Sequence, residues 1–373
     1  MQRRAGGLAL VIILSAATTL PESATGATVQ EVPCDGDFHV VKKFTRGRRT
    51  GVFSPTISGT DLWLFQTFTD KEGEYRAQLK KWDGSLWTTI AVPRPAQGFY
   101  YPTSLDVTED QSVWLAGWHQ TSAAEKALVL RWKAQSWEET PVPEFEHGSP
   151  LVDLDMLSPD EGWAVGEYEL GENRRPLTLR WNGEAWEHVD APGTSSATLN
   201  AVSAAASDDV WAVGRAGDPL AIHWDGAAWV EHALPPVEDR FLHPLGVHAA
   251  SSDEAWTVGA WEGDRSRSAV IAWDGATWSD EPVRDFRGHD SLTSVDEAAG
   301  VGWIVGGRRS NSGTFPIALR LGAGGWNRIE AENPGRGGHL IDVEAAQDGS
   351  AWGTGRASSR RLGLFGVLQK ACM

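Results

Sequence analysis

Short apolar segments, separated by turns rich in Gly, Pro, Asp and Asn, follow one another from residue 53 to the C-terminus. The clearest set lies at residues 199–203, 210–214, 220–224 and 229–233. Each of these has the length and the β-branched or aromatic content of a strand. Asp225-Gly226 predicts a tight hairpin, because Gly takes the positive φ that such a turn requires. Beyond residue 27 no segment shows sustained helical periodicity, so we expect an all-β protein.

This four-strand pattern recurs along the chain, and each copy has Trp at equivalent positions. The first Trp of each copy stands at Trp63, Trp114, Trp163, Trp211, Trp256, Trp303 and Trp352, at spacings of 45 to 51 residues. Such a period indicates a repeat array, and four short strands per copy predict a seven-bladed β-propeller with four antiparallel strands per blade. A β-solenoid is the alternative, but its repeats are shorter. Eighteen of the 20 Trp fall at repeat positions, which predicts packing between blades and not ligand binding.

The two ends of the chain predict how the ring closes. The last copy has predicted strands near 340–343, 351–354 and 362–370 but no fourth strand. Residues 38–44 predict a strand that belongs to no copy of the repeat. The N-terminal strand can therefore complete the seventh blade and remove two open sheet edges. This closure would place Cys34 beside Cys372, so we predict a disulfide in place of the missing hairpin. Two unpaired thiols near frayed ends are the alternative.

Residues 1–27 have the features of a signal peptide, followed by a single domain over 28–373. Arg3 and Arg4 precede an apolar run at 8–20, and small residues precede a cleavage position after Ala27. An N-terminal anchor is the alternative, but the run is short for a bilayer. We expect an extracellular or periplasmic monomer. The formal charge of -17 argues against nucleic-acid binding, and no later segment predicts membrane insertion.

The repeat phrase resembles a known group of proteins. The pattern D-x-x-W-A-V-G followed by W-D-G-x-x-W resembles repeats of secreted bacterial β-propellers related to sialidase-like (BNR, or Asp-box) and photosystem II assembly-factor propellers. The hairpin from Trp273 to Trp278 is similar to an Asp-box, although no residue separates Asp274 from Gly275. The resemblance covers residues 53–370 and implies a propeller fold. An Asp-box is a structural turn, and no Tyr–Glu pair can be assigned, so sialidase activity is not implied.

Variable loops predict where a site would lie. Because strands alternate in direction, the long b–c and d–a loops share one face of the ring, where function is expected. Three histidines, His243, His289 and His339, precede the Trp of successive blades by 13 or 14 residues. They could surround one side of the channel mouth and bind zinc or another transition metal. Three partly exposed loop histidines without a common ligand are the alternative.

Acidic residues are expected on strand a, the innermost strand of a propeller blade. The positions eight or ten residues before the repeat Trp hold Asp106, Asp153, Asp155, Asp342 and Glu344, with Ser203 and His248 among the others. Such carboxylates could hold calcium or another divalent ion, or perform general acid/base chemistry. A solvated channel is the alternative.

Aromatic residues on the same face are candidates for contact with a carbohydrate or protein ligand: Tyr100, Tyr101, Trp118 and Trp261. Trp118 and Trp261 lie outside the repeat pattern, where loops are expected to begin. The sequence contains no nucleophile-elbow, zinc-protease or phosphate-loop motif. We therefore expect a non-enzymatic scaffold that binds a protein or glycan through its long loops. An extracellular carbohydrate-active hydrolase or lyase using the channel carboxylates is one alternative, and a structural cell-envelope protein is another.

Overall fold

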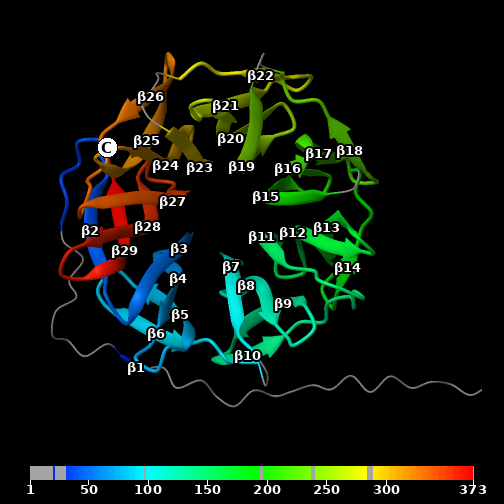
Figure 1. Ribbon diagram of the computed structural model, residues 1–373, viewed down its shortest axis with the longest axis horizontal. Helices are drawn as coiled ribbons and strands as arrows, with labels where there is room; N and C mark the ends of the chain where they lie inside the picture. Colours follow the sequence, from blue (N-terminus) through cyan, green and yellow to red (C-terminus); the bar gives the residue numbers. More distant parts are fainter. Residues whose placement is uncertain are drawn as a thin grey trace, which may run out of the picture.

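A computed structural model describes residues 20–21, 31–95, 98–193, 196–236, 240–283 and 289–372. They form seven antiparallel sheets arranged in a ring, with four strands per blade (Figure 1). The predicted seven-bladed β-propeller is thus confirmed. Apart from Leu20–Pro21, the predicted signal peptide lies outside the described residues. Within the described ranges, no helix has the length and apolar character that a bilayer crossing requires.

The strands of the first three blades follow one another in sequence from the channel outward. Blade 1 consists of β3 (Arg48–Ser58), β4 (Asp61–Thr69), β5 (Tyr75–Trp82) and β6 (Trp87–Ala91). Its outer strand also pairs with β1 (Leu20–Pro21). Blade 2 consists of β7 (Tyr100–Val107), β8 (Val113–Gln120), β9 (Glu125–Lys133) and β10 (Ser136–Glu139). Blade 3 consists of β11 (Leu151–Ser158), β12 (Glu161–Leu170), β13 (Asn173–Trp181) and β14 (Trp186–His188).

Blades 4 to 6 repeat this order. Blade 4 consists of β15 (Ala197–Ala206), β16 (Asp209–Ala216), β17 (Asp218–Trp224) and β18 (Trp229–His232). Blade 5 consists of β19 (Phe241–Ser251), β20 (Glu254–Glu262), β21 (Arg267–Trp273) and β22 (Trp278–Asp280). Blade 6 consists of β23 (His289–Ala298), β24 (Val301–Ser310), β25 (Gly313–Gly322) and β26 (Gly325–Ile329).

Blade 7 joins the two ends of the chain, as the sequence predicts. It contains β27 (Gly337–Ala345), β28 (Ala351–Ser359) and β29 (Gly363–Ala371), and its outer strand is β2 (His39–Phe44). β2 runs antiparallel to β29, with His39 opposite Lys370. Cys34 and Cys372 form a disulfide with their Cα atoms 4.7 Å apart. The predicted closure and disulfide are therefore both confirmed.

Tryptophan pairs and triads fill the space between blades. The first Trp of a blade packs on the second and third Trp of the next blade, because strand b faces the outer strands of its neighbour. Ring centroids lie 5.0 Å apart for Trp163 and Trp224, 5.0 Å for Trp163 and Trp229, and 4.8 Å for Trp211 and Trp278. At the sixth junction Phe38, just before β2, takes the place of the strand-d Trp and lies 5.6 Å from Trp303. The repeat Trp are thus the framework of the ring.

The connections between strands b and c differ from the sequence expectation. They were expected to be long loops, for example between Tyr168 and Pro176, but they are long hairpins. In blade 3 the ladder continues to the pair Leu170 and Asn173, which leaves only a tight turn. Continuing the ladder satisfies backbone N–H and C=O groups that a loop would have to pair in other ways. The long-loop face of the ring is therefore partly an array of hairpin tips.

Candidate functional site

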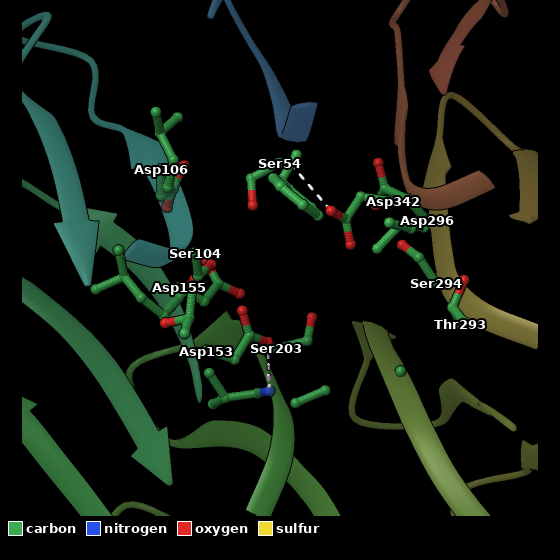
Figure 2. A pocket seen from close by; sticks show the side chains of 18 of the residues that line it. Ser54, Ser104, Asp106, Asp153, Asp155, Ser203, Thr293, Ser294, Asp296 and Asp342 are labelled. Atoms are coloured by element: carbon green, nitrogen blue, oxygen red, sulfur yellow. Dashed lines mark hydrogen bonds between the residues drawn. The ribbon is translucent and has the colours of Figure 1, made fainter. Parts of the chain in front are cut away.

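The central channel forms a cavity of about 720 Å³. The first strand of every blade lines it, so seven separate parts of the sequence contribute to one space (Figure 1). Figure 2 shows Asp106, Asp153 and Asp155 on one side, with Asp296 and Asp342 across the opening. The acidic lining expected from the sequence is present.

The residue opposite the first repeat Trp is polar in every blade. These seven residues, here called the channel belt, are Thr56, Asp106, Asp155, Ser203, His248, Asp296 and Glu344. Directly opposite residues of an antiparallel pair share one face of the sheet. Each belt side chain therefore lies at the inner end of a blade interface, where the Trp packing meets the channel.

At five of the seven blade junctions, a belt side chain accepts a backbone hydrogen bond from the next blade. Met156 N–H donates to Asp106 Oδ2 at 2.7 Å, and Ala204 N–H donates to Asp155 Oδ2 at 2.8 Å. The same contact joins Ala249 N to Ser203 Oγ (3.0 Å), Ala345 N to Asp296 Oδ2 (2.7 Å) and Ile57 N to Glu344 Oε1 (3.1 Å). In each case the donor follows the belt residue of the next blade. The acidic side chains thus satisfy backbone groups around the ring.

A second tier repeats this arrangement two residues earlier on strand a. Asp153 accepts from Val202 N at 3.0 Å, and Asp342 accepts from Ser54 N at 3.0 Å (Figure 2). The second of these bonds crosses the junction between blade 7 and blade 1. The two ends of the chain are therefore held together at two places. The Asp342 carboxylate connects them beside the channel, and the disulfide connects them at the outer edge of the ring.

Burial raises the pKa values of several channel carboxyls. It raises the pKa of Asp155 to about 8, and the nearby Asp106 charge adds to the rise. Burial also raises the pKa values of Asp106 and Asp342, each to about 6. The pKa of Glu344 is raised well above its ordinary value by burial and by Asp296. Part of the belt is consequently protonated at neutral pH, because its carboxyls share one desolvated space.

His248 is the basic member of the belt. Its Nδ1 lies 2.9 Å from Asp296 Oδ1. Burial acts to lower the pKa of His248, but the hydrogen bond and the charge of Asp296 outweigh it and raise the pKa. This pair joins blade 5 to blade 6 through two side chains. At the junction of blades 1 and 2, Thr56 Oγ1 instead donates to Leu105 O at 3.2 Å.

The three histidines predicted near the channel mouth have separate local contacts. His243 Nδ1 lies 3.3 Å from Glu262 Oε1, and His289 Nδ1 accepts from Ser266 N at 3.5 Å. His339 packs against Gly307, and its pKa is lowered by burial and then by the Arg356 charge. Within the described ranges, no three His, Cys, Asp or Glu side chains are arranged so that they could hold one metal ion.

The four predicted aromatic residues divide into two groups. Tyr100 is 5% exposed, with its hydroxyl donating to Leu115 O at 2.7 Å, and Trp261 is 6% exposed in the core of blades 4 and 5. Neither ring is available to a ligand in this conformation. Tyr101 and Trp118, by contrast, are only partly buried and stack with centroids 4.2 Å apart. Trp118 lies within β8 and not in a loop.

Tyr101 and Trp118 belong to an aromatic row that reaches the channel. Tyr75 lines the channel, and its ring centroid lies 4.6 Å from that of Tyr101. The ring centroid of Phe99 lies 6.4 Å from that of Tyr101. Burial raises the pKa of Tyr75. In the neighbouring blade 7, the Arg356 guanidinium lies 4.8 Å from the Phe53 ring centroid. We call these four residues the aromatic row: Tyr75, Phe99, Tyr101 and Trp118. The row extends from the channel to the long-loop face of blade 2.

Three site features are not predicted by the sequence analysis. Asp296 is missed because it precedes Trp303 by seven residues, whereas positions eight and ten were counted. Tyr75 and Arg356 are missed because their proximity to the channel depends on how strands b and c extend. The spacing is shorter in blade 6 because the hairpin between β23 and β24 is tight, with Ala298 paired directly with Val301.

Comparison with known proteins supports the fold. No protein-family model and no curated protein sequence matches the chain. Among solved structures, YCF48 bound to D1 peptide is similar with a TM-score of 0.58 and 14% identity, over 89% of this chain and 94% of that one. The shared property is the fold. At this identity the similarity extends to no site residue or ligand.

Two further propellers have the same architecture. The WD40 propeller domain of Doa1 matches with a TM-score of 0.54 and 10% identity, over 89% of this chain and 96% of that one. The propeller domain of the Trilobed protease from Pyrococcus furiosus matches with a TM-score of 0.53 and 9% identity, over 86% and 96%. The similarity to YCF48 confirms, at the level of fold, the expected likeness to photosystem II assembly-factor propellers. The likeness to Asp-box proteins remains a prediction.

Proposed function

We propose that this protein is an exported, non-enzymatic scaffold that binds a polypeptide segment at the long-loop mouth of its channel. The observation that carries the proposal is the aromatic row. It is partly exposed, lies beside a large opening, and has no counterpart in the repeat framework. Flat aromatic side chains provide large contact area at low conformational cost, which is why they are common in binding sites.

The hydrogen bonding of the carboxyls favours binding over catalysis. A glycoside hydrolase needs two carboxyl groups aimed at one bond, one as acid and one as base or nucleophile. Here each of Asp106, Asp153, Asp155 and Asp342 accepts a backbone N–H from the adjacent blade. A structural contact of this kind already accounts for their presence in the channel.

Export is supported by the disulfide. A bond that joins the two ends of a domain persists in an oxidising compartment. An external location also agrees with the sequence features of residues 1–27. The structural neighbour bound to D1 peptide indicates that a propeller of this architecture can hold a peptide. A glycan is the second candidate ligand, because aromatic faces also stack on sugar rings.

The test is a binding screen with matched variants. The protein is immobilised and incubated with proteins from the culture medium and envelope and with a glycan array, and hydrolysis is assayed on the same array. The double variant Tyr101→Ala/Trp118→Ala should lose at least tenfold in affinity for the captured ligand, since stacking contacts of this kind contribute about 1–2 kcal/mol or more. Val230→Ala, at an exposed position on β18, is the control.

Three results would overturn the proposal. Unchanged affinity after Tyr101→Ala/Trp118→Ala would remove the aromatic row from the binding site. Turnover of a glycan that Asp153→Asn or Asp342→Asn abolishes would show an enzyme. Capture of glycans alone would replace the polypeptide with a carbohydrate as the ligand.

A further inference from the structure

Blade 7 and the start of blade 1 have a charge opposite to that of the whole protein. Residues 38–60 contain no Asp or Glu and five Lys or Arg, and residues 349–373 contain no Asp or Glu and four Lys or Arg. The whole chain, in contrast, has a formal charge of -17. The two stretches lie far apart in sequence, but β2 pairs with β29 and β3 packs beside them (Figure 1).

The positive side chains gather at one end of these strands. β2 reaches the long-loop face at Phe44, opposite Gly366, and the tip of the β28–β29 hairpin follows just beyond. Arg336 N–H donates to Ser358 O at 2.8 Å, which brings a third segment to the same hairpin. The resulting surface, here called the basic edge, contains Arg46, Arg48, Arg49, Arg336, Arg360 and Arg361, all of them exposed.

The basic edge is not neutralised within the protein. In the part of the chain that the structure describes, none of its six arginines forms an ion pair. Elsewhere on the ring arginines commonly pair with acids, as Arg180 does with Glu161 at 2.6 Å. Six uncompensated guanidinium groups on an acidic protein create a strong local field that attracts an anionic partner.

Two leucines at the hairpin tip restrict the kind of partner. Leu362 and Leu364 are 47% and 46% exposed, beside Arg360 and Arg361. Part of the backbone at this tip is already paired, because Ser359 pairs with Gly363 and Leu362 N–H donates to Ser359 Oγ at 3.0 Å. The tip can therefore enter an apolar medium without leaving that backbone donor unpaired, which is the condition for shallow insertion among lipids.

We propose that the basic edge docks the protein on an anionic phospholipid surface. The arginines bind headgroup phosphates, for which the guanidinium fork is well suited, and the two leucines reach the boundary with the acyl chains. An acidic polypeptide would use the arginines but would not require paired leucines at a projecting turn. Docking is peripheral, so the bilayer is not crossed and the channel mouth on the same face lies close to the membrane.

Vesicle sedimentation tests this assignment. The full chain is mixed with vesicles of roughly equal parts phosphatidylglycerol and phosphatidylcholine, or with phosphatidylcholine alone. The readout is the excess of binding to the anionic vesicles, because the apolar run at 8–20 could bind either kind. Each basic residue near an anionic surface strengthens binding about fivefold, so Arg360→Gln/Arg361→Gln should reduce the excess about 30-fold. Leu362→Gln should also reduce it.

The control is Arg215→Gln/Arg265→Gln, which removes two exposed arginines from blades 4 and 5 on the same face. It should change the excess by less than about twofold, because it lies outside the basic edge. Thermal unfolding and the near-ultraviolet circular dichroism of the Trp residues verify that each variant is folded. If Arg360→Gln/Arg361→Gln does not fold, Arg48→Gln takes its place.

Three results would overturn the proposal. Equal binding to both kinds of vesicle would remove the role of lipid charge. An anionic excess that survives Arg360→Gln/Arg361→Gln would place the contact elsewhere. Binding of heparin or poly-glutamate by the arginines, without binding of anionic vesicles, would assign the basic edge to a soluble polyanion.

Discussion

In six of the seven blades, the first Trp of the repeat lies between a basic residue on strand c and a polar belt residue on strand a. On strand c the residue opposite the first Trp is basic in six blades: Lys81, Arg131, Arg180, His223, Arg320 and Lys370. Lys81 Nζ lies 5.0 Å from the Trp63 ring centroid, and Arg131 lies 5.0 Å from that of Trp114. Cation–π attraction of this kind contributes about 0.5–1 kcal/mol at exposed sites and more when desolvated. The repetition therefore includes charge as well as shape.

At the scale of single residues, the belt predicts that the protein becomes more stable as pH falls from 8 to 5. The raised pKa values of Asp155 and Asp106, about 8 and about 6, mean that the folded state keeps protons that the unfolded state has lost above pH 4. Stability then falls as pH rises through the folded pKa values. His248 acts in the same direction, because its raised pKa stabilises the fold at low pH and that contribution is lost as pH rises.

Asp155→Asn tests this prediction. Asn can still accept the hydrogen bond from Ala204 N but has no charge to desolvate. We expect the variant to be about 2 kcal/mol more stable than the wild type at pH 8, with a smaller difference at pH 5. Chemical denaturation at both pH values measures this. Asp218→Asn, on the exposed β16–β17 hairpin, should leave the pH dependence unchanged. A wild type that is most stable at pH 8 would contradict the prediction.

At the scale of the strand pair, a steric requirement explains why a Gly such as Gly214 recurs on strand b. Strand a contains a bulge opposite this Gly, for example between Leu199 and Ala201 in blade 4. A Cβ on Gly214 would overlap the backbone oxygen of Thr198, and Gly117, Gly166, Gly259, Gly306 and Gly355 meet the same obstruction in their own blades. Any side chain would separate strand a from strand b. The bulge that turns the belt toward the channel thus requires Gly on the neighbouring strand.

Gly214→Ala should therefore destabilise the protein by about 3 kcal/mol or more, because the clash is with backbone and cannot be relieved by a side-chain rotation. Gly217→Ala is the comparison. Gly217 has a φ of 82° at a hairpin turn, with no atom near the added Cβ, so that substitution should cost only about 1 kcal/mol. Urea unfolding of both variants gives the two values. Similar losses in the two variants would contradict the steric explanation.

Features that recur in every blade can be predicted from the sequence, whereas features that occur once mostly cannot. The blades, their strand order and the Cys34–Cys372 closure follow from the periodic Trp and from one missing strand, since these are local patterns with one topological solution. In the aromatic row, Tyr101 and Trp118 are candidates from the sequence, but their continuation to Tyr75 cannot be predicted, because Tyr75 and Tyr101 belong to different blades whose spacing depends on packing. The basic edge is also hidden, because a net charge averages over surfaces that folding separates.

At the scale of the whole molecule, the ring closes by noncovalent and covalent contacts on the same blade. β2 pairs with β29 on one side, and Phe38 N–H donates to Glu330 O at 2.9 Å in the connection from blade 6 on the other. Near the channel, Asp342 and Glu344 join blade 7 to the backbone of blade 1. Loss of β2 would expose the edge of β29 and one side of the Trp303 ring. The closing strand consequently stabilises blade 7 and its junctions with blades 6 and 1.

The disulfide should therefore contribute several kcal/mol to the stability of the ring. It closes a loop with a sequence separation of 338 residues, for which chain entropy gives a ceiling of about 6 kcal/mol. We expect the double variant Cys34→Ser/Cys372→Ser to be about 2–5 kcal/mol less stable than the oxidised wild type, and limited proteolysis to cut first near β2. A reducing agent should lower the unfolding temperature of the wild type but not that of the double variant. Equal stability of the two proteins under oxidising conditions would show that β2 pairing and the carboxylate contacts close the ring without the covalent bond.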